Sequence, residues 1–64
     1  MKIKAIYTKY ENYDEEVVIV DFSRWHAICI DKLGRVIWVN IERVKIVDKD
    51  YLDLLKENKN ERND

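Results

Sequence analysis

The chain offers few side chains that could carry out a reaction, and their spacing does not form a reactive group. His26 is the only histidine, and Ser23 lies close to it in the sequence. A catalytic histidine needs a carboxylate that orients it and a reacting partner within hydrogen-bond distance. The strand pairing derived below places Asn40 opposite His26, and an amide performs no acid–base work. We therefore expect His26 to be a partly exposed strand residue and Ser23 to lie in a corner.

The acidic residues and the cysteine do not predict a metal site either. The run 14–16 (Asp14, Glu15 and Glu16) attracts cations, but it lacks the glycine and the ligand spacing of a calcium loop. We expect it to be a solvated acidic loop, with recognition of a basic partner as the alternative. Cys29 is the only cysteine, so no internal disulfide or thiolate cluster can form, and we expect a small buried apolar residue. The sequence thus predicts no catalytic residue, no metal, no cofactor and no enzyme.

Composition limits the class of protein further. The chain has 64 residues, of which 39% are charged, with a net charge of −1. One domain of this size has a thin core, so contact with a second chain would help to stabilise it. A near-neutral charge disfavours a nucleic-acid coat, which needs a basic excess. No long apolar run is present, so we expect no signal peptide, no membrane span and a cytoplasmic location.

The most informative segment spans residues 24–47, in which two strands rich in isoleucine and valine flank the turn 31–34. A type I turn over Lys32 and Leu33, with Gly34 in the left-handed conformation, would place Arg35 opposite Asp31. The cross-strand pairs that follow are Ile30 with Val36, Cys29 with Ile37, Ile28 with Trp38, and Ala27 with Val39.

This pairing defines two faces, because side chains alternate along a strand. The first face, which we expect to form the core, carries Trp25, Ala27, Cys29, Ile37, Val39 and Ile41. The second carries His26, Ile28, Ile30, Val36, Trp38 and Asn40. A hairpin that is apolar on both sides does not lie with one side in water. The second face therefore needs a cover, which is either another element of the chain or a partner.

The rest of the chain completes a small β fold. Alternating and β-branched residues predict strands over 2–8 and 15–22, a polar loop over 10–14, and a short strand over 44–47 after a helical turn at 41–43. Asp48 is expected to cap a helix over about residues 48–57, with apolar residues along one side. The polar tail 58–64 is expected to be disordered, so that residues 1–57 form the single domain.

Two short motifs resemble those of SH3 domains. The first is Ala5-Ile6-Tyr7 followed by Tyr10, which is similar to the Ala-Leu-Tyr-x-Tyr opening of eukaryotic SH3 domains. The second is Gly34-Arg35-Val36-Ile37 followed by residues 41–47, which resembles their ending through a helical turn into the final strand. The resemblance covers roughly residues 3 to 47. It implies a mainly β fold, a five-stranded SH3-like small barrel, here with a short C-terminal α-helix.

The chain departs from the SH3 pattern at the peptide groove. It contains no proline, and Asn40 and Ile41 stand where SH3 domains carry the Pro and Tyr of that groove. Trp25 also stands alone, whereas SH3 domains have a pair of tryptophans at the start of the third strand. The resemblance therefore implies the fold and does not imply binding of Pro-rich peptides.

Trp38 is the residue whose surroundings the sequence leaves open. Either the apolar side of the C-terminal helix covers it, or it faces a partner or a second copy. An uncovered tryptophan beside Ile28 and Val36 would be an interaction hot spot.

The expected function is contact and not catalysis. We expect a non-enzymatic adaptor, regulator or inhibitor that acts through protein–protein contact, with a protein partner or as a homodimer. Small chains of this kind are typical accessory proteins of phages, viruses and mobile elements. The residues expected to make the contact are Trp38, Ile28, Val36, His26, Tyr10 and Tyr13. The alternative is a nucleic-acid-binding barrel, similar in architecture to the DNA-coating chromatin proteins of thermophilic archaea, which contacts phosphates through Lys2, Lys4, Arg43 and Lys45.

Overall fold

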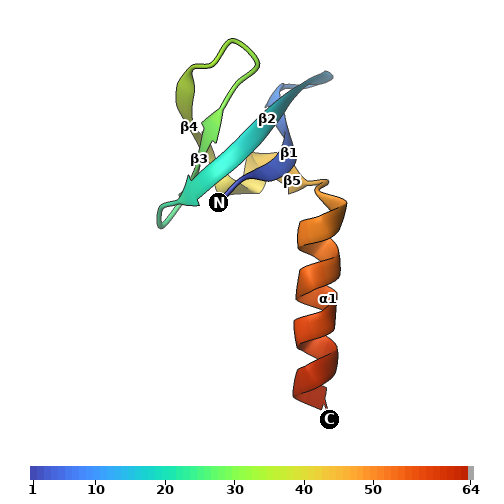
Figure 1. Ribbon diagram of the computed structural model, residues 1–64. Helices are drawn as coiled ribbons and strands as arrows, with labels where there is room; N and C mark the ends of the chain where they lie inside the picture. The colour runs from blue at the N-terminus through green and yellow to red at the C-terminus, as the bar shows by residue number, and fades with distance from the viewer. Residues whose placement is uncertain (64) are drawn as a thin grey trace.

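The computed structural model describes the backbone of residues 1–63 and the side chains of residues 1–56. Five antiparallel strands form one open sheet in the order β4-β3-β2-β1-β5, and a helix follows the last strand (Figure 1). The elements are β1 (Ile3–Tyr10), β2 (Tyr13–Phe22), β3 (His26–Ile30), β4 (Val36–Asn40), the 3₁₀ turn η1 (Ile41–Arg43), β5 (Val44–Ile46) and α1 (Lys49–Asn63). The predicted class, mainly β with a C-terminal helix, is confirmed.

The β3–β4 hairpin has the predicted register. Ile28 lies opposite Trp38, and His26 lies opposite Asn40. Gly34 has a φ of 81°, its N–H donates to the carbonyl oxygen of Asp31 at 2.9 Å, and the Asp31 N–H donates to the Arg35 carbonyl at 2.9 Å. This is the type I turn with a left-handed glycine that the sequence predicts.

The side chain of Asp31 holds this turn together. Asp31 is only 5% exposed, and its Oδ1 accepts hydrogen bonds from the backbone N–H groups of Leu33 and Arg35, both at 2.9 Å. Its Oδ2 accepts from Arg35 Nε at 2.8 Å, as an ion pair. The backbone N–H of Arg35, followed by the Arg35 side chain and the Leu33 N–H, lowers the pKa of Asp31, and this outweighs the opposing effect of desolvation.

The core lies on one face of the sheet. Its buried residues are Ile3, Ala5, Val17, Ile19, Ala27, Cys29 and Val39. Ala27, Cys29 and Val39 were predicted there, and Ile37 packs against them while partly exposed. Tyr7 and Phe22 supply aromatic rings at the edge of this core.

The prediction that Trp25 belongs to the core is wrong, because its side chain is 65% exposed. The pairing of β2 with β3 shifts between Ile19 and Asp21, and this irregularity puts Phe22 opposite Ala27. Phe22 therefore fills the end of the core that Trp25 was expected to fill. Trp25 remains in the corner before β3, with the guanidinium carbon of Arg24 5.4 Å from its ring centre.

Ile41 was also expected in the core and is 43% exposed. It is the first residue of η1, so the chain has already left the direction of β4 at this point. Asn40 caps this turn, because its side-chain oxygen accepts a hydrogen bond from the Glu42 N–H at 2.8 Å. The helical turn itself lies where it was predicted, over residues 41–43.

The first loop is much shorter than predicted. β1 continues to Tyr10 and β2 begins at Tyr13, so only residues 11–12 form the turn, with Asn12 at a φ of 64°. The acidic run 14–16 consequently lies on β2 and not in a loop. Asp14 is tied to β1 there, because the Thr8 hydroxyl donates to its Oδ1 at 2.8 Å.

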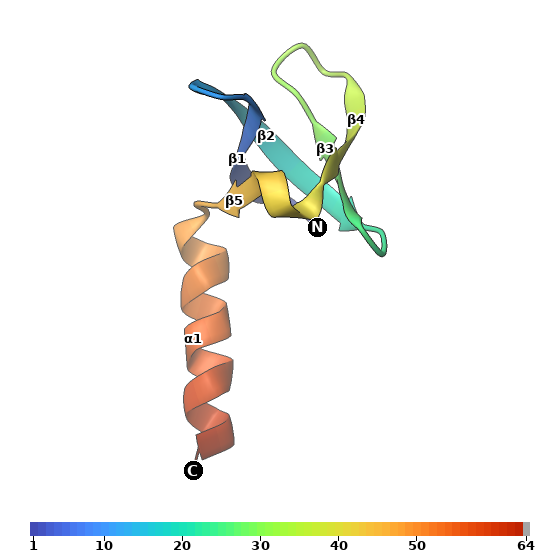
Figure 2. The ribbon, with the colours of Figure 1, turned by 180° about the vertical axis from the view of Figure 1, so that it is seen from behind.

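Helix α1 leaves the sheet on the β1–β5 side (Figures 1 and 2). Asp48 caps it as predicted, since its Oδ1 accepts from the Tyr51 N–H at 3.2 Å. The other carboxylate oxygen accepts from the Lys4 N–H at 3.1 Å, which joins the start of the helix to β1. The backbone of α1 extends to Asn63, beyond the predicted end near residue 57. The predicted disorder of the tail 58–64 falls on residues whose side chains lie outside the description, and it stays a prediction.

The Asp31 carboxylate predicts how stability depends on pH. Because its pKa is lower in the folded state than in the unfolded chain, it stabilises the fold fully above about pH 4, the ordinary value for Asp. This contribution is lost as the pH falls through the folded-state pKa. We expect Asp31→Asn to be less stable than the parent at pH 7 and to lose less stability between pH 7 and pH 3, as measured by urea unfolding. Asp53→Asn, at an exposed position on α1, is the control, and a parental pH dependence in Asp31→Asn would contradict this role.

Candidate interaction surface

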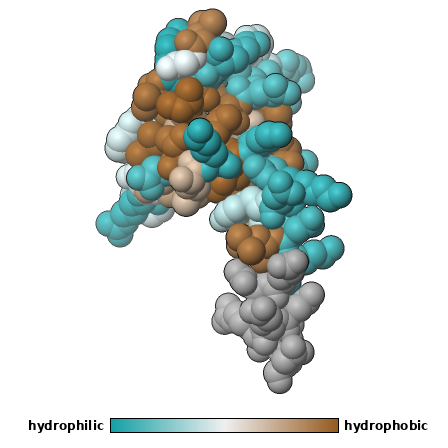
Figure 3. Space-filling model, in the orientation of Figure 1, coloured by the Kyte–Doolittle hydropathy of each residue, from teal (hydrophilic) through white to brown (hydrophobic). Residues whose placement is uncertain are grey.

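The face of the sheet opposite the core, here called the outer face, is not covered by any described part of the chain. Strand alternation and the observed register place on it Lys4, Ile6, Glu16, Val18, His26, Ile28, Ile30, Val36, Trp38, Asn40 and Lys45. The space-filling view shows apolar surface gathered over the strands and bordered by hydrophilic side chains (Figure 3).

Five of these residues form an apolar patch on β2, β3 and β4. The patch consists of Val18, Ile28, Ile30, Val36 and Trp38. Val18, Ile30 and Val36 are paired in one row across the three strands, and Ile28 and Trp38 are paired in the next. Directly opposite side chains in antiparallel strands are about 5 Å apart at their Cβ atoms, so each row is in contact.

Trp38 is the most prominent residue of the apolar patch. Its side chain is 60% exposed, and that of Val36 is 63% exposed. The His26 ring lies beside Trp38 with 6.1 Å between ring centres and an angle of 58° between ring planes. The patch therefore combines an exposed tryptophan, aliphatic side chains and a neighbouring histidine, and aromatic residues are enriched in contact surfaces.

Of the two alternatives that the sequence left open for Trp38, coverage by α1 is not observed for the described side chains. Asp48 fixes the start of the helix to β1, whereas Trp38 lies on β4 at the opposite edge of the sheet. Tyr51 packs against the core, and the leucines that follow it, Leu52, Leu54 and Leu55, remain exposed. The helix points away from the sheet in both views (Figures 1 and 2).

The structure brings together only part of the predicted contact set. Trp38, Ile28, Val36 and His26 lie side by side on β3 and β4. Tyr10 and Tyr13 form a separate edge-on pair at the β1–β2 turn, with 6.0 Å between ring centres. Along β2 this turn is about 26 Å from the residue that pairs with Ile28, at the usual rise of a strand. Tyr10 and Tyr13 are therefore not part of the apolar patch, and a partner can contact the patch without contacting them.

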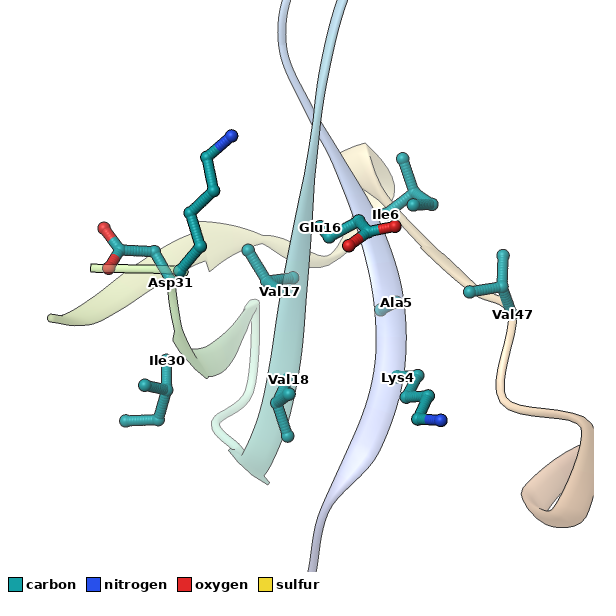
Figure 4. Close-up of a pocket in the computed structure, with 10 residues that line it drawn as sticks. Lys4, Ala5, Ile6, Glu16, Val17, Val18, Ile30, Asp31 and Val47 are labelled. Atoms are coloured by element: carbon teal, nitrogen blue, oxygen red, sulfur yellow. The ribbon is translucent and has the colours of Figure 1, made fainter. Parts of the chain in front are cut away.

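A shallow groove of about 400 Å³ adjoins the apolar patch on the outer face (Figure 4). Its apolar lining includes Ile6, Val18, Ile30 and Val47, and its charged lining includes Lys4, Glu16, Asp31 and Lys32. The Asp31 carboxylate is already engaged by the turn. The groove extends the patch toward β1, and it contains no histidine, serine or cysteine that could act as a nucleophile or base.

Only some of the residues predicted to contact phosphates lie on the same face of the sheet. Lys4 and Lys45 fall on the outer face by strand alternation, whereas Lys2 precedes β1 and has no strand pairing. Arg43 belongs to η1, where it lines a second hollow of about 340 Å³ together with Lys45. Glu16 lies in the same row as Lys45, with Ile6 between them, so the basic area is interrupted by a carboxylate.

The remaining side chains that could react, Cys29 and His26, belong to the strands of the β3–β4 hairpin. Cys29 is fully buried, and desolvation raises the pKa of its thiol, so the reactive thiolate is disfavoured. His26 faces Asn40 across the hairpin, as predicted. Within the described side chains, no group of three His, Cys, Asp or Glu residues is placed to hold a metal ion.

Sequence reasoning missed two features of this surface. Val18 belongs to the apolar patch, and the uniform β-branched run 17–20 gave no indication of which residues face outward. The backbone edge of β4 was also not recognised as free, because strand order is not visible in a hydropathy pattern.

Comparisons with family models, curated proteins and solved structures found no match for this chain. None of the helices in the described part of the chain has the length and apolar character needed to cross a membrane. Function must therefore follow from the surface of the chain itself.

The difference between the two faces predicts that truncating a side chain lowers stability far more on the core face than on the outer face. Ile19 is 0% exposed, so Ile19→Ala should lower the free energy of unfolding by about 2–5 kcal/mol. Trp38→Ala removes a larger side chain from the outer face and should cost less than about 1 kcal/mol in dilute protein. Urea unfolding measures both. A loss after Trp38→Ala as large as that after Ile19→Ala would place Trp38 in a packed interior and contradict the assignment of the outer face.

Proposed function

We propose that this protein is a non-enzymatic binding module that acts through protein–protein contact on the outer face. The observation that carries the proposal is the 60% exposure of Trp38, at the β4 side of the apolar patch. Burying apolar surface contributes about 25 cal/mol per Å², and tryptophan is enriched among the hot-spot residues of interfaces. The opposite face already forms the core, so the patch is available for a partner.

We propose an SH3-like small barrel as the fold that presents this surface. The proposal is supported by β5 lying next to β1 at one end of the strand order, and by a 3₁₀ turn between β4 and β5. Residues from four strands share one buried cluster, with Val44 and Ile46 of β5 packed against it. Binding of Pro-rich peptides is not part of the proposal, because Asn40 is engaged in capping η1.

The mechanism that fits such a surface is occlusion. A rigid sheet face that includes Trp38 can cover the functional surface of another protein and so act as an adaptor, regulator or inhibitor. No side chain of the patch would need to react, and the rigid strands would limit the entropy lost on binding. We place such a module among the accessory proteins of phages, viruses and mobile elements, acting in the cytoplasm.

The two tryptophans of the chain provide a matched test of this proposal. Trp38 and Trp25 are exposed to similar extents, 60% and 65%, but only Trp38 belongs to the apolar patch. Trp38→Ala should weaken association, whether with a host protein or with the chain itself, by about 30-fold or more, as expected for a hot spot. Trp25→Ala should leave affinity within a few-fold. Surface plasmon resonance with the purified partner, or sedimentation for self-association, measures both, and equal losses in the two variants would refute the assignment of the surface.

We propose nucleic-acid binding as the second candidate, supported by the shared outward placement of Lys4 and Lys45. Trp fluorescence during titration with a mixed-sequence DNA duplex should then show binding at low salt that weakens steeply as salt rises. Lys4→Ala and Lys45→Ala should each reduce the salt slope by about 1, whereas Lys49→Ala on α1 should not. Absence of binding at low salt would remove this candidate and leave the protein partner.

A further inference from the structure

The two edge strands of the sheet are protected to different degrees. β5 is only 3 residues long and carries a lysine, Lys45, in its middle. β4 has 5 residues, Val36-Ile37-Trp38-Val39-Asn40, with no charge, no proline and no irregularity in its pairing with β3. Natural edge strands are normally protected from pairing by lysine, proline, bulges or shortness. β5 has two of these protections, and β4 has only its moderate length.

The backbone groups of β4 alternate between its neighbour and the open edge. The Arg35 carbonyl accepts from the Asp31 N–H, and the Ile41 N–H donates to the Trp25 carbonyl, so odd-numbered residues bond toward β3. In an antiparallel pair, bonded and non-bonded residues alternate. The N–H and C=O groups of Val36 and Trp38 and the N–H of Asn40 therefore point to the free edge, whereas the Asn40 carbonyl serves the first bond of η1. Their side chains lie on the outer face, so one edge presents both the hydrogen-bonding groups and the exposed Trp38.

From this geometry we infer that a second copy of the chain pairs with β4, strand to strand and antiparallel, about a twofold axis at Trp38. This inference rests on the proposed function, because Trp38 belongs both to the apolar patch and to the β4 edge. Because only even-numbered residues have free backbone groups, the two strands must pair even with even. A twofold axis centred on β4 places Trp38 opposite Trp38 of the second copy, and Val36 opposite Asn40 of the second copy.

This register brings no like charges together. The first charged residue beside β4 is Arg35, and it would lie opposite Ile41 of the second copy. The two apolar patches would join into one continuous face, with the tryptophan rings in contact at the axis. Helix α1 does not obstruct the approach, because β4 lies on the side of the sheet away from it (Figures 1 and 2). The β4 strand of a second copy can pair with this edge because it is uncharged and extended, and because its free backbone groups belong to the same even-numbered residues.

The pairing can be tested with engineered cysteines that leave Trp38 in place. The double variant Val36→Cys, Asn40→Cys would bring the two new thiols together between copies, at a Cα separation suited to a disulfide. Within one chain these positions are about 13 Å apart along the strand, too far for an internal bridge. Each single variant faces a residue that is not cysteine, and the native Cys29 is buried, so the single variants and the parent are matched controls.

Sedimentation velocity of the parent should show a species of twice the 7.8 kDa chain mass that dissociates on dilution. Trp38→Lys, which places two ammonium groups at the axis, should be a monomer. On mild oxidation only the double cysteine variant should form a covalent dimer on a non-reducing gel. Cross-linking by either single variant, or a dimer that the double variant does not cross-link, would overturn this register.

A parent chain that is monomeric at every concentration would overturn the second copy as the occupant. The proposed function would survive that result if binding of another protein still depends on Trp38, for instance an extended peptide paired with β4. A dimer unaffected by Trp38→Lys would instead contradict both the inferred occupant and the proposed surface.

Discussion

The hydrogen bonds of the Asp31 carboxylate are the interaction on which the rest of this structure depends. Asp31 holds the backbone of the β3–β4 turn at Leu33 and Arg35, and it pairs with the Arg35 side chain. These contacts determine the register of the hairpin. A slip of β4 by one residue would exchange the two faces of that strand, because side chains alternate. Val39 would then face outward, and Trp38 would have to fit into a core built around small side chains.

Once the register is set, the sheet has one face for its core and one face left over. The core is built largely from small and β-branched residues, such as Ala5, Ala27 and Val39, which allow the strands to pack closely. The outer face receives isoleucine, valine and tryptophan without any element of the described chain to cover them. A protein of this size has little interior to spare. We therefore interpret the uncovered surface as the working part of the molecule, and the core as its support.

The connection to the helix explains why the chain does not cover its own patch. Asp48 caps α1 and at the same time accepts a hydrogen bond from the backbone of Lys4. The helix therefore starts at the β1–β5 side, across the sheet from β4. Among the described side chains of the helix, only Tyr51 packs against the core. A helix that is held by its first turn and directed away from the sheet leaves the outer face open.

Local patterns were sufficient to predict the parts of this fold that depend on neighbouring residues. The turn with left-handed Gly34, the hairpin register, the helical turn at 41–43 and the Asp48 cap all follow from contacts close in sequence. The errors arose where distant segments decide. The shift in pairing beyond Ile19 gives the core position to Phe22 and leaves Trp25 exposed.

The candidate surface was also predictable only where it depends on residues that are close in sequence. The grouping of Trp38, Ile28, Val36 and His26 follows from the hairpin alone and is observed. The separation of Tyr10 and Tyr13 from that group depends on the full length of β2, which continues where a loop was expected. Whether a helix covers the patch depends on the direction in which it leaves β5, and amphipathic spacing carries no information on direction.

Amide hydrogen exchange along β4, followed by NMR in dilute and in concentrated protein, tests the central claim most directly. The amides of Ile37 and Val39 point toward β3 and should exchange slowly in both samples. The amides of Val36, Trp38 and Asn40 point to the free edge. They should exchange rapidly in dilute protein and become protected in concentrated protein as a second copy pairs with the strand. Rapid exchange of these three amides at every concentration, with Ile37 and Val39 still protected, would contradict the account of β4 as a contact edge.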